Sequence, residues 1–231
     1  MKLLKKICVM LIIILILLGA TLTGLGYNEY RTAINKNSLE DKVEAIKGQE
    51  NYITFDEINS DLLKATVAIE DRRFYEHDGV DYFALVRTLL SNALAGEIVG
   101  GGSTITQQTA KNLYFGYHPS IIRKIAEVFM AKDLEKNYSK KEILELYVNI
   151  INYGDNHIGI KEASNGYFRC EPIDLNLNQS SLLAGIPQSP ANFQLSNHEE
   201  QARIRQKAVL EAMVKEKDIN YVQSMQVQGN Q

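Results

Sequence analysis

The chain has 231 residues, 45% of them hydrophobic and 23% charged, with a formal net charge of -3. This length predicts one domain with appendages. The weak negative charge disfavours a nucleic-acid-binding protein, because such proteins present strongly basic surfaces. The two cysteines, Cys8 and Cys170, lie in segments of different character, so they predict neither a disulfide framework nor a metal site.

The N-terminus carries the pattern of a membrane anchor. Lys2, Lys5 and Lys6 precede an uncharged run over residues 7–26. A helix of roughly 20 residues spans about 30 Å, the thickness of a bilayer core. We therefore predict a cytoplasmic tail over 1–6, an anchor over 7–26 and an exported remainder, because basic flanks stay inside. A cleaved signal peptide is the alternative, although no clear A-x-A site stands near residues 19–21.

The next segments favour helices. Residues 27–53 are polar with mixed charge and are interpreted as a juxtamembrane helix or linker. Thr54 and Glu57 fit a capping box that opens a helix through Ile69. Asp81 is placed to cap another helix, whose apolar residues recur at helical spacing up to Leu94.

The remaining segments complete a mainly α-helical prediction. A glycine-rich loop over 96–102 precedes a helix capped by Ser103 or Thr104. Further helices are predicted over about 120–136, after a capping box at Ser139, and over 160–168, 178–186 and 199–215. A small β element is expected near 150–160. We assign 54–220 to the main domain and 221–231 to a flexible tail.

A carboxylate pair, Glu70 and Asp71, stands where an apolar helical pattern ends. Carboxylates at the edge of an apolar surface can have raised pKa values and act as acids or bases. Arg72, Arg73 and His77 follow in one short loop, a density of titratable groups that favours a functional site. His77 itself is interpreted as a structural hydrogen-bonding residue.

The glycine-rich segment is a candidate anion site. Three consecutive glycines let a backbone approach a ligand closely, and a capped helix start offers backbone N–H groups. Gln107, Gln108 and Lys111 add polar groups suited to phosphate and sugar hydroxyls. A flexible loop before a capped helix explains the pattern equally well, and the Walker A ending is absent.

Four basic residues, Arg87, Lys111, Arg123 and Lys124, are hypothesised to converge on one ligand. A leaving pyrophosphate needs such cations, because negative charge develops on it in the transition state. A solvated helix face is the alternative for Arg123 and Lys124. Glu127, one turn after Arg123, is flanked by apolar residues and is expected to be partly buried.

Taken in order, these motifs resemble the glycosyltransferase domain that polymerises peptidoglycan from lipid II, glycosyltransferase family 51. The matching stretches are 70–81, 101–108, Arg123 and Lys124 with Glu127, and 134–149, with weaker matches at 167–168 and 182–185. The resemblance covers roughly 55–215 and implies a lysozyme-like helical fold. Since the family's larger members continue into a transpeptidase domain, the end at Gln231 suggests a monofunctional enzyme.

The resemblance also implies a reaction. Glu70 would act as the general base on the 4-hydroxyl of an acceptor N-acetylglucosamine. That oxygen would attack C1 of the donor N-acetylmuramic acid, release undecaprenyl pyrophosphate and invert the linkage to β-1,4. Glu127 matches the second acidic residue, which organises the pyrophosphate with or without a divalent cation (Mg or Mn), or assists proton transfer.

Substrate binding is implied for twelve further positions: Asp71, Arg87, Gly102, Ser103, Thr104, Gln107, Gln108, Lys111, Asn112, Arg123, Lys124 and Asn149. The implied partners are lipid II, the growing glycan strand and the membrane, with penicillin-binding transpeptidases and other wall-synthesis proteins as candidates and no nucleic acid. The implied location is the bacterial cytoplasmic membrane, with one span and the catalytic domain on its outer face.

Some positions depart from the family pattern. Arg169 and Cys170 stand where Gly-Lys is usual, Pro119 stands where a basic residue is common, and the region after Pro190 lacks Tyr-Asn-Pro. These departures concern donor affinity and the rim of the cleft. Two other functions therefore stay open, a lysozyme-like glycan hydrolase and a weakly active lipid II-binding scaffold.

Overall fold

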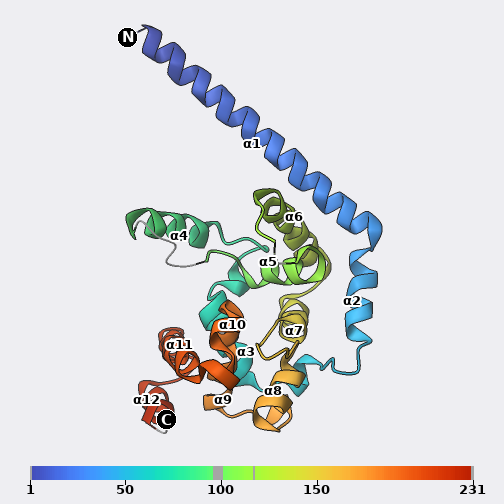
Figure 1. The fold of residues 1–231 in the computed structure, drawn as a ribbon, viewed down its shortest axis with the longest axis vertical. Helices are drawn as coiled ribbons and strands as arrows, with labels where there is room; N and C mark the ends of the chain where they lie inside the picture. The colour runs from blue at the N-terminus through green and yellow to red at the C-terminus, as the bar shows by residue number, and fades with distance from the viewer. Residues whose placement is uncertain (1, 96–100, 117, 230–231) are drawn as a thin grey trace.

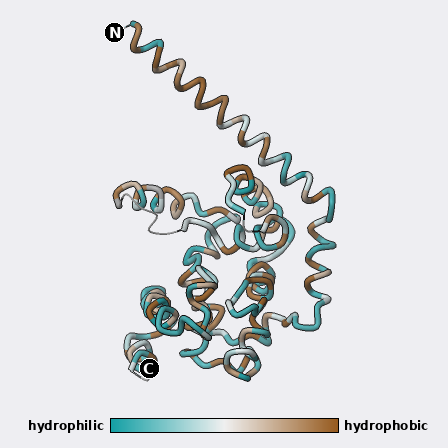
Figure 2. Tube along the Cα trace, viewed as in Figure 1, coloured by the Kyte–Doolittle hydropathy of each residue, from teal (hydrophilic) through white to brown (hydrophobic). Residues whose placement is uncertain are grey.

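The computed structural model describes residues 2–95, 101–116 and 118–229 (Figure 1). Its first helix, α1 (Lys2–Lys36), projects from the domain and is long and apolar enough to cross a membrane. The projecting part is hydrophobic almost throughout (Figure 2). In length and composition α1 is therefore consistent with a single-pass anchor.

The C-terminal part of α1 belongs to the folded domain. It packs against α6 (Ile121–Asn137), where a Cβ on Gly26 would lie 2.5 Å from Cγ2 of Ile125. The Tyr30 hydroxyl donates a hydrogen bond of 2.8 Å to Asp133. After Ser38, which caps it, α2 (Leu39–Lys47) buries its apolar face. Residues 27–53 were interpreted as either a juxtamembrane helix or a linker. In the structure most of them belong to helices that pack against the domain.

The capping box at Thr54 differs from its prediction. It opens a single 3-10 turn, η1 (Phe55–Glu57), rather than a long helix. The helix α3 (Ser60–Glu70) starts instead at Asn59, whose side chain accepts a hydrogen bond from the backbone N–H of Asp61. A second cap residue a few positions downstream therefore sets the start of the helix.

The other helices follow the sequence pattern closely. They are α4 (Tyr82–Ala95), α5 (Ile105–Ala110) with a π turn η3 (Lys111–Phe115), α7 (Lys140–Ile150), α8 (Ile160–Phe168), α9 (Leu177–Gly185), α10 (Pro190–Phe193), α11 (Leu195–Lys215) and α12 (Tyr221–Gly229), with 3-10 turns η2 (Phe74–Glu76), η4 (Pro172–Asp174) and η5 (Ile186–Gln188). An isolated bridge pairs Asn152 with Ile158, the small β element that was expected. The mainly α-helical fold class is confirmed.

The structure defines the start of α5 and the segment after 220. Thr104, and not Ser103, caps α5, while residues 96–100 of the predicted glycine-rich loop lie outside the described residues. The tail after 220, expected to be flexible, forms α12 instead. Its Ser224 and Val227 are buried against the domain, so the segment has an apolar face to cover and a reason to stay helical.

The core places the end of α3 at the centre of the molecule. On one side α3 packs against α9 and α11, and on the other α5 packs against α6 and α7. One continuous cluster of buried apolar side chains joins these helices, including Leu62, Phe74 and Tyr147. In contrast, α4 projects from the body and exposes Phe83 and Leu94 (Figure 1).

Candidate active site

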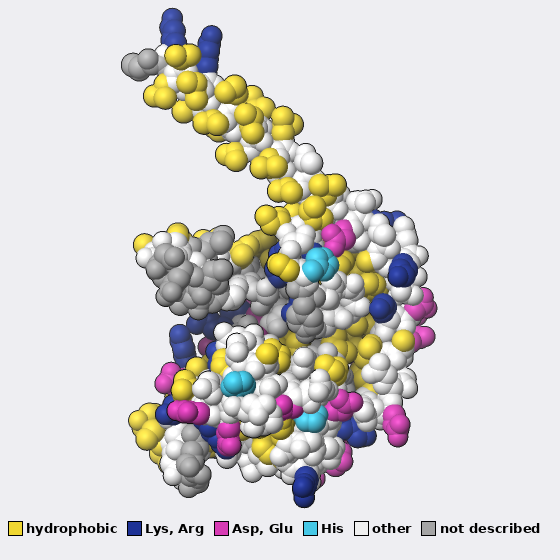
Figure 3. Space-filling view, in the orientation of Figure 1, with side chains coloured by type: hydrophobic (Ala, Val, Ile, Leu, Met, Phe, Trp, Pro, Cys, Tyr) yellow, Lys and Arg dark blue, Asp and Glu magenta, His cyan; other side chains and the backbone are white. Residues whose placement is uncertain are grey.

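Glu70 is the last residue of α3 and faces a hollow of about 360 Å³. Its walls come from α3, the glycine-rich segment, α5, η3, η5 and α11. In Figure 3 basic side chains gather in the hollow between α4 and the rest of the domain. The lining residues are Ile69, Glu70, Gly101, Ser103, Gln108, Lys111, Pro187, Gln188 and Arg205.

The Glu70 carboxylate is nearly buried, with 10% of its side chain exposed. Gln108 Nε2 donates a hydrogen bond of 2.8 Å to one oxygen, and Arg205 Nη2 lies 3.6 Å from the other. Burial raises the pKa of the Glu70 carboxyl, and Asp71 adds to this, whereas Gln108, Arg205 and Lys111 act in the opposite direction. A carboxylate with a raised pKa that opens to a hollow is suited to accept a proton.

A second acidic group, Glu127, is held by cations on its own helix. Its side chain is only 1% exposed and pairs with Arg123 Nη1 and Lys124 Nζ, each at 2.8 Å. Lys124 Nζ also donates a hydrogen bond of 2.6 Å to Ser103 Oγ, at the edge of the hollow. Arg123, with 12% of its side chain exposed, is therefore not part of a solvated helix face, whereas Lys124 is 45% exposed while it keeps its pair with Glu127. Glu127 is buried more completely than expected.

Lys111 connects this cluster to Glu70. Burial lowers the pKa of its ammonium group, as do Lys124 and Arg123, while Glu127 and Glu70 raise it. Three of the four basic residues, Lys111, Arg123 and Lys124, thus lie within electrostatic reach of one another, and their convergence on one ligand stays a prediction. Arg87 is the exception, because it lies on the exposed face of α4 and lines an apolar surface there with Phe83.

Several motif residues bind one another rather than facing the hollow. Thr104 Oγ1 accepts the backbone N–H of Gln107 at 3.0 Å, and the Gln107 side chain accepts that of Thr104 at 3.1 Å. Asp71 accepts the backbone N–H of Ile105 at 3.0 Å and pairs with His77 at 3.0 Å. These donors at the start of α5 are already satisfied by protein oxygens. The capped helix therefore fixes the loop geometry, and His77 has the structural environment expected of it.

Three more predicted binding residues lie at the periphery of the hollow or away from it. Asn149 makes two hydrogen bonds with the backbone of Ile53, at 3.0 Å and 2.9 Å, and so ties α7 to the segment before η1. Asn112 donates to the backbone carbonyl of Gln108. Gly102 lies close to α4, since a Cβ there would be 3.4 Å from Thr88 Oγ1.

Sequence reasoning missed Arg205, Pro187 and Gln188, which line the same hollow as Gln108. Arg205 stands in an ordinary charged segment of α11, far along the chain from Glu70, so no local pattern marks it. Packing of α11 on α3 brings the two together. The one available signal is the apolar stripe of α11, which predicts a helix face turned to the core.

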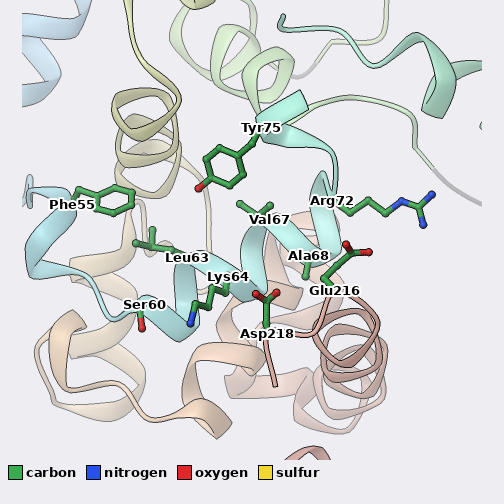
Figure 4. A pocket seen from close by; sticks show the side chains of 10 residues that line it. All are labelled: Phe55, Ser60, Leu63, Lys64, Val67, Ala68, Arg72, Tyr75, Glu216 and Asp218. Carbon is green, nitrogen blue, oxygen red and sulfur yellow. The ribbon is translucent and has the colours of Figure 1, made fainter. Parts of the chain in front are cut away.

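Another hollow, of about 390 Å³, lies on the flank of α3 (Figure 4). Apolar side chains such as Leu63, Val67 and Tyr75 line it, together with the charged Lys64 and Asp218. Glu70 is absent from its lining, so this hollow is separate from the candidate active site.

The acidic groups that the structure describes do not gather into an all-protein metal site. Among the described residues, no three His, Cys, Asp or Glu side chains gather as a ligand set. Glu127 is engaged by two cations at 2.8 Å, which is a poor environment for a divalent metal ion. Glu127 is thus already neutralised by protein cations, and the described residues offer no all-protein site for Mg or Mn.

Together, the fold and the site define a helical domain with an apolar N-terminal helix and a buried carboxylate beside a basic hollow. The chain belongs to the transglycosylase family, whose model matches residues 37–214. The lysozyme-like fold class predicted from the sequence is thereby confirmed. The match begins before the predicted domain boundary at 54 and includes α2.

Curated relatives agree with this assignment. The chain is 41% identical over 165 residues to penicillin-binding protein 1A of Aquifex aeolicus (strain VF5), which is 71% of this chain and 23% of that protein. It is 37% identical over 177 residues to penicillin-binding protein 1F of Bacillus subtilis (strain 168), 77% of this chain and 25% of that protein. Penicillin-binding protein 2D of the same strain is 41% identical over 174 residues, 75% of this chain and 25% of that protein. The chain thus spans about a quarter of these relatives' length.

Proposed function

We propose that this protein is a peptidoglycan glycosyltransferase that polymerises lipid II into glycan strands. The observation that carries the proposal is the position of Glu70. Its carboxylate opens to a hollow that Lys111 lines and whose rim Lys124 reaches through Ser103. A base beside a cationic pocket suits attack by a sugar hydroxyl on a carbon that loses pyrophosphate. Membership of the transglycosylase family supports the same reaction.

In the proposed mechanism Glu70 accepts the proton of the acceptor's 4-hydroxyl while that oxygen attacks C1 of the donor. The C1–O bond to pyrophosphate breaks on the opposite face, so the new linkage is β-1,4. Gln108 fixes the carboxylate through its 2.8 Å hydrogen bond. Lys111, Arg123 and Lys124 balance the charge that develops on the leaving group. Glu127 holds two of these cations in place before the donor binds.

The membrane position is part of the proposal. Because α1 is basic at its N-terminal end and apolar along its projecting part, we place the N-terminus in the cytoplasm and the domain on the outer face of the membrane. Lipid II, an amphipathic donor, would then reach the hollow from the bilayer. We propose the growing glycan strand as the second substrate, and penicillin-binding transpeptidases and other wall-synthesis proteins as partners.

A glycan hydrolase is the competing enzyme. Such enzymes place two carboxylates about 5 to 10 Å apart on either side of the glycosidic bond. Glu127 disfavours this function, because at 1% exposure it is covered by Arg123 and Lys124 and is not open to a sugar. A lipid II-binding scaffold would need the donor pocket, but it would not need a nearly buried carboxylate that is suited to accept a proton.

The test is incubation of the full chain in detergent with fluorescent lipid II, followed by separation of products by size. Polymeric glycan supports the proposal. Release of fragments from finished peptidoglycan, without polymer from lipid II, would identify a hydrolase. Binding of lipid II without turnover would identify a scaffold.

For the cofactor, we propose that the basic side chains act in place of an obligatory divalent cation (Mg or Mn). The same assay with and without a chelator tests this. Polymerisation that persists in the chelator agrees with the proposal, and complete loss that added Mg or Mn restores would contradict it.

A further inference from the structure

Arg205 is the charged side chain that α11 contributes to the hollow, and its described contacts converge on Glu70. Its Nη2 lies 3.6 Å from Oε1 of Glu70, and 18% of the Arg205 side chain is exposed. Its Nε is buried without a hydrogen-bond partner. The stem of Arg205 passes over α9 at Gly185, where a Cβ would come within 2.9 Å of Arg205 Cγ. The backbone of α9 thus leaves room for this side chain.

The neighbour on the same helix has a different environment. Arg203 binds Glu199, Asn178 and Gln206, a network that ties α11 to α9. Among the described residues, Arg205 forms its ion pair with Glu70. A buried arginine with an unsatisfied Nε is costly for stability. Its position is therefore better explained by the carboxylate it faces than by the fold.

Charged groups approach Glu70 from each surrounding element. On its own chain segment Asp71 follows it, and burial and Asp71 both disfavour the ionised carboxylate. Gln108 on α5, Lys111 on η3 and Arg205 on α11 favour it. Tyr153, buried between α7 and α8, is also within electrostatic reach. Helix α9, which packs on α3, carries neither acidic nor basic side chains.

We propose that Arg205 is a positioning residue for the reaction: its guanidinium holds the Glu70 carboxylate against Gln108 and keeps it ionised for proton abstraction. The inference rests on the proposed function, in which Glu70 is the base. Arg205 itself transfers no proton, because a guanidinium stays protonated in proteins. It acts through Glu70, so its removal would change the pH at which the base is available.

Three variants of the full chain in detergent test the proposal. Arg205→Gln removes the charge at similar size, Arg205→Lys keeps it, and Lys207→Gln removes an exposed charge from the same helix as a matched control. The first measurement is a ¹³C titration of the Glu70 carboxyl, assigned by its loss in Glu70→Gln. It needs no substrate. The second is the pH profile of kcat/KM for lipid II, with the unfolding temperature as a check on folding.

In Arg205→Gln the titration midpoint of Glu70 is expected to move to higher pH. In Arg205→Lys it moves less, and in Lys207→Gln it does not move. The acidic limb of kcat/KM moves in the same order. At the acidic end the loss in Arg205→Gln is about 10-fold or more and shrinks as pH rises, because a cation within 4–6 Å typically changes a carboxyl's ionisation equilibrium by at least that factor. A purely structural role would lower activity by one factor at every pH.

An unchanged Glu70 midpoint in folded Arg205→Gln would overturn the proposal. If that variant does not fold, Arg205→Lys decides. The proposal expects a smaller shift of the Glu70 midpoint in this variant, so an unchanged midpoint and an unchanged pH profile would overturn the role given to the guanidinium. If the wild-type protein does not polymerise lipid II, the proposed function fails while the titration still reports whether Arg205 controls Glu70.

Discussion

The Glu127→Gln variant tests the buried charge cluster. The change keeps the size of the side chain and removes the negative charge that Arg123 and Lys124 share at 2.8 Å each. Removing one partner of a buried ion pair costs about 3–5 kcal/mol. The Lys124 side chain is 45% exposed and regains water, whereas that of Arg123 is 12% exposed and does not. We therefore expect a loss of about 3–5 kcal/mol, almost all of it from the buried pair with Arg123, because the exposed pair with Lys124 adds less than about 1 kcal/mol.

Thermal unfolding followed by circular dichroism in detergent measures this loss. For a domain of this size, 1 kcal/mol corresponds to about 2–4 °C, so the unfolding temperature should fall by about 6–20 °C. The control is Asp56→Asn, which breaks the exposed pair with Lys141, where the two side chains are 84% and 54% exposed. It should cost less than about 1 kcal/mol. Equal shifts in the two variants would refute the claim that Glu127 is a buried anchor for its cations.

Three further predictions follow from other parts of the structure. Ser139→Ala removes the cap of α7, which accepts the backbone N–H of Glu142, and should cost about 1 kcal/mol in urea unfolding; no change would show that the capping box is dispensable. Gly159→Ala should cost more than about 2 kcal/mol, because φ is +86° and a Cβ would lie 2.4 Å from the Asn149 carbonyl oxygen; a soluble, equally stable variant would contradict this. Because burial raises the pKa of Glu70, its base form is lost as pH falls through that raised value, so kcat/KM should fall at a higher pH than an ordinary glutamate would give; a flat acidic profile would exclude Glu70 as the titrating base.

Local signals in the sequence predicted most of the fold. The box at Ser139 and the cap at Thr104 each depend on residues three positions apart, and both helices start where expected. The box at Thr54 satisfied the same rule but ended after one turn, because Asn59 offered a second cap before the apolar stripe of α3. The α12 helix was missed because its few buried residues depend on packing against the domain.

The candidate site was predictable in part. The pair Glu70 and Asp71 was singled out by its place at the end of an apolar helix, and the family resemblance assigned the base role to Glu70. The structure places Glu70 in a hollow with Gln108 and Lys111. Asp71 was assigned to substrate binding but is committed to His77 and α5, a pairing that no local spacing reveals. Arg205 was missed for the same reason, since its contact with Glu70 arises from packing of distant helices.

The most direct test of the central claim compares Glu70→Gln with Glu76→Gln in the fluorescent lipid II assay. Glu76 lies in the same loop, is exposed and pairs with Arg73. Its replacement therefore tests whether another carboxylate near Glu70 can act as the general base. The rate of glycan formation should fall by about 10²- to 10⁴-fold in Glu70→Gln, the usual contribution of a general base, and stay near the wild-type rate in Glu76→Gln. Polymerisation at the wild-type rate by folded Glu70→Gln would contradict the account.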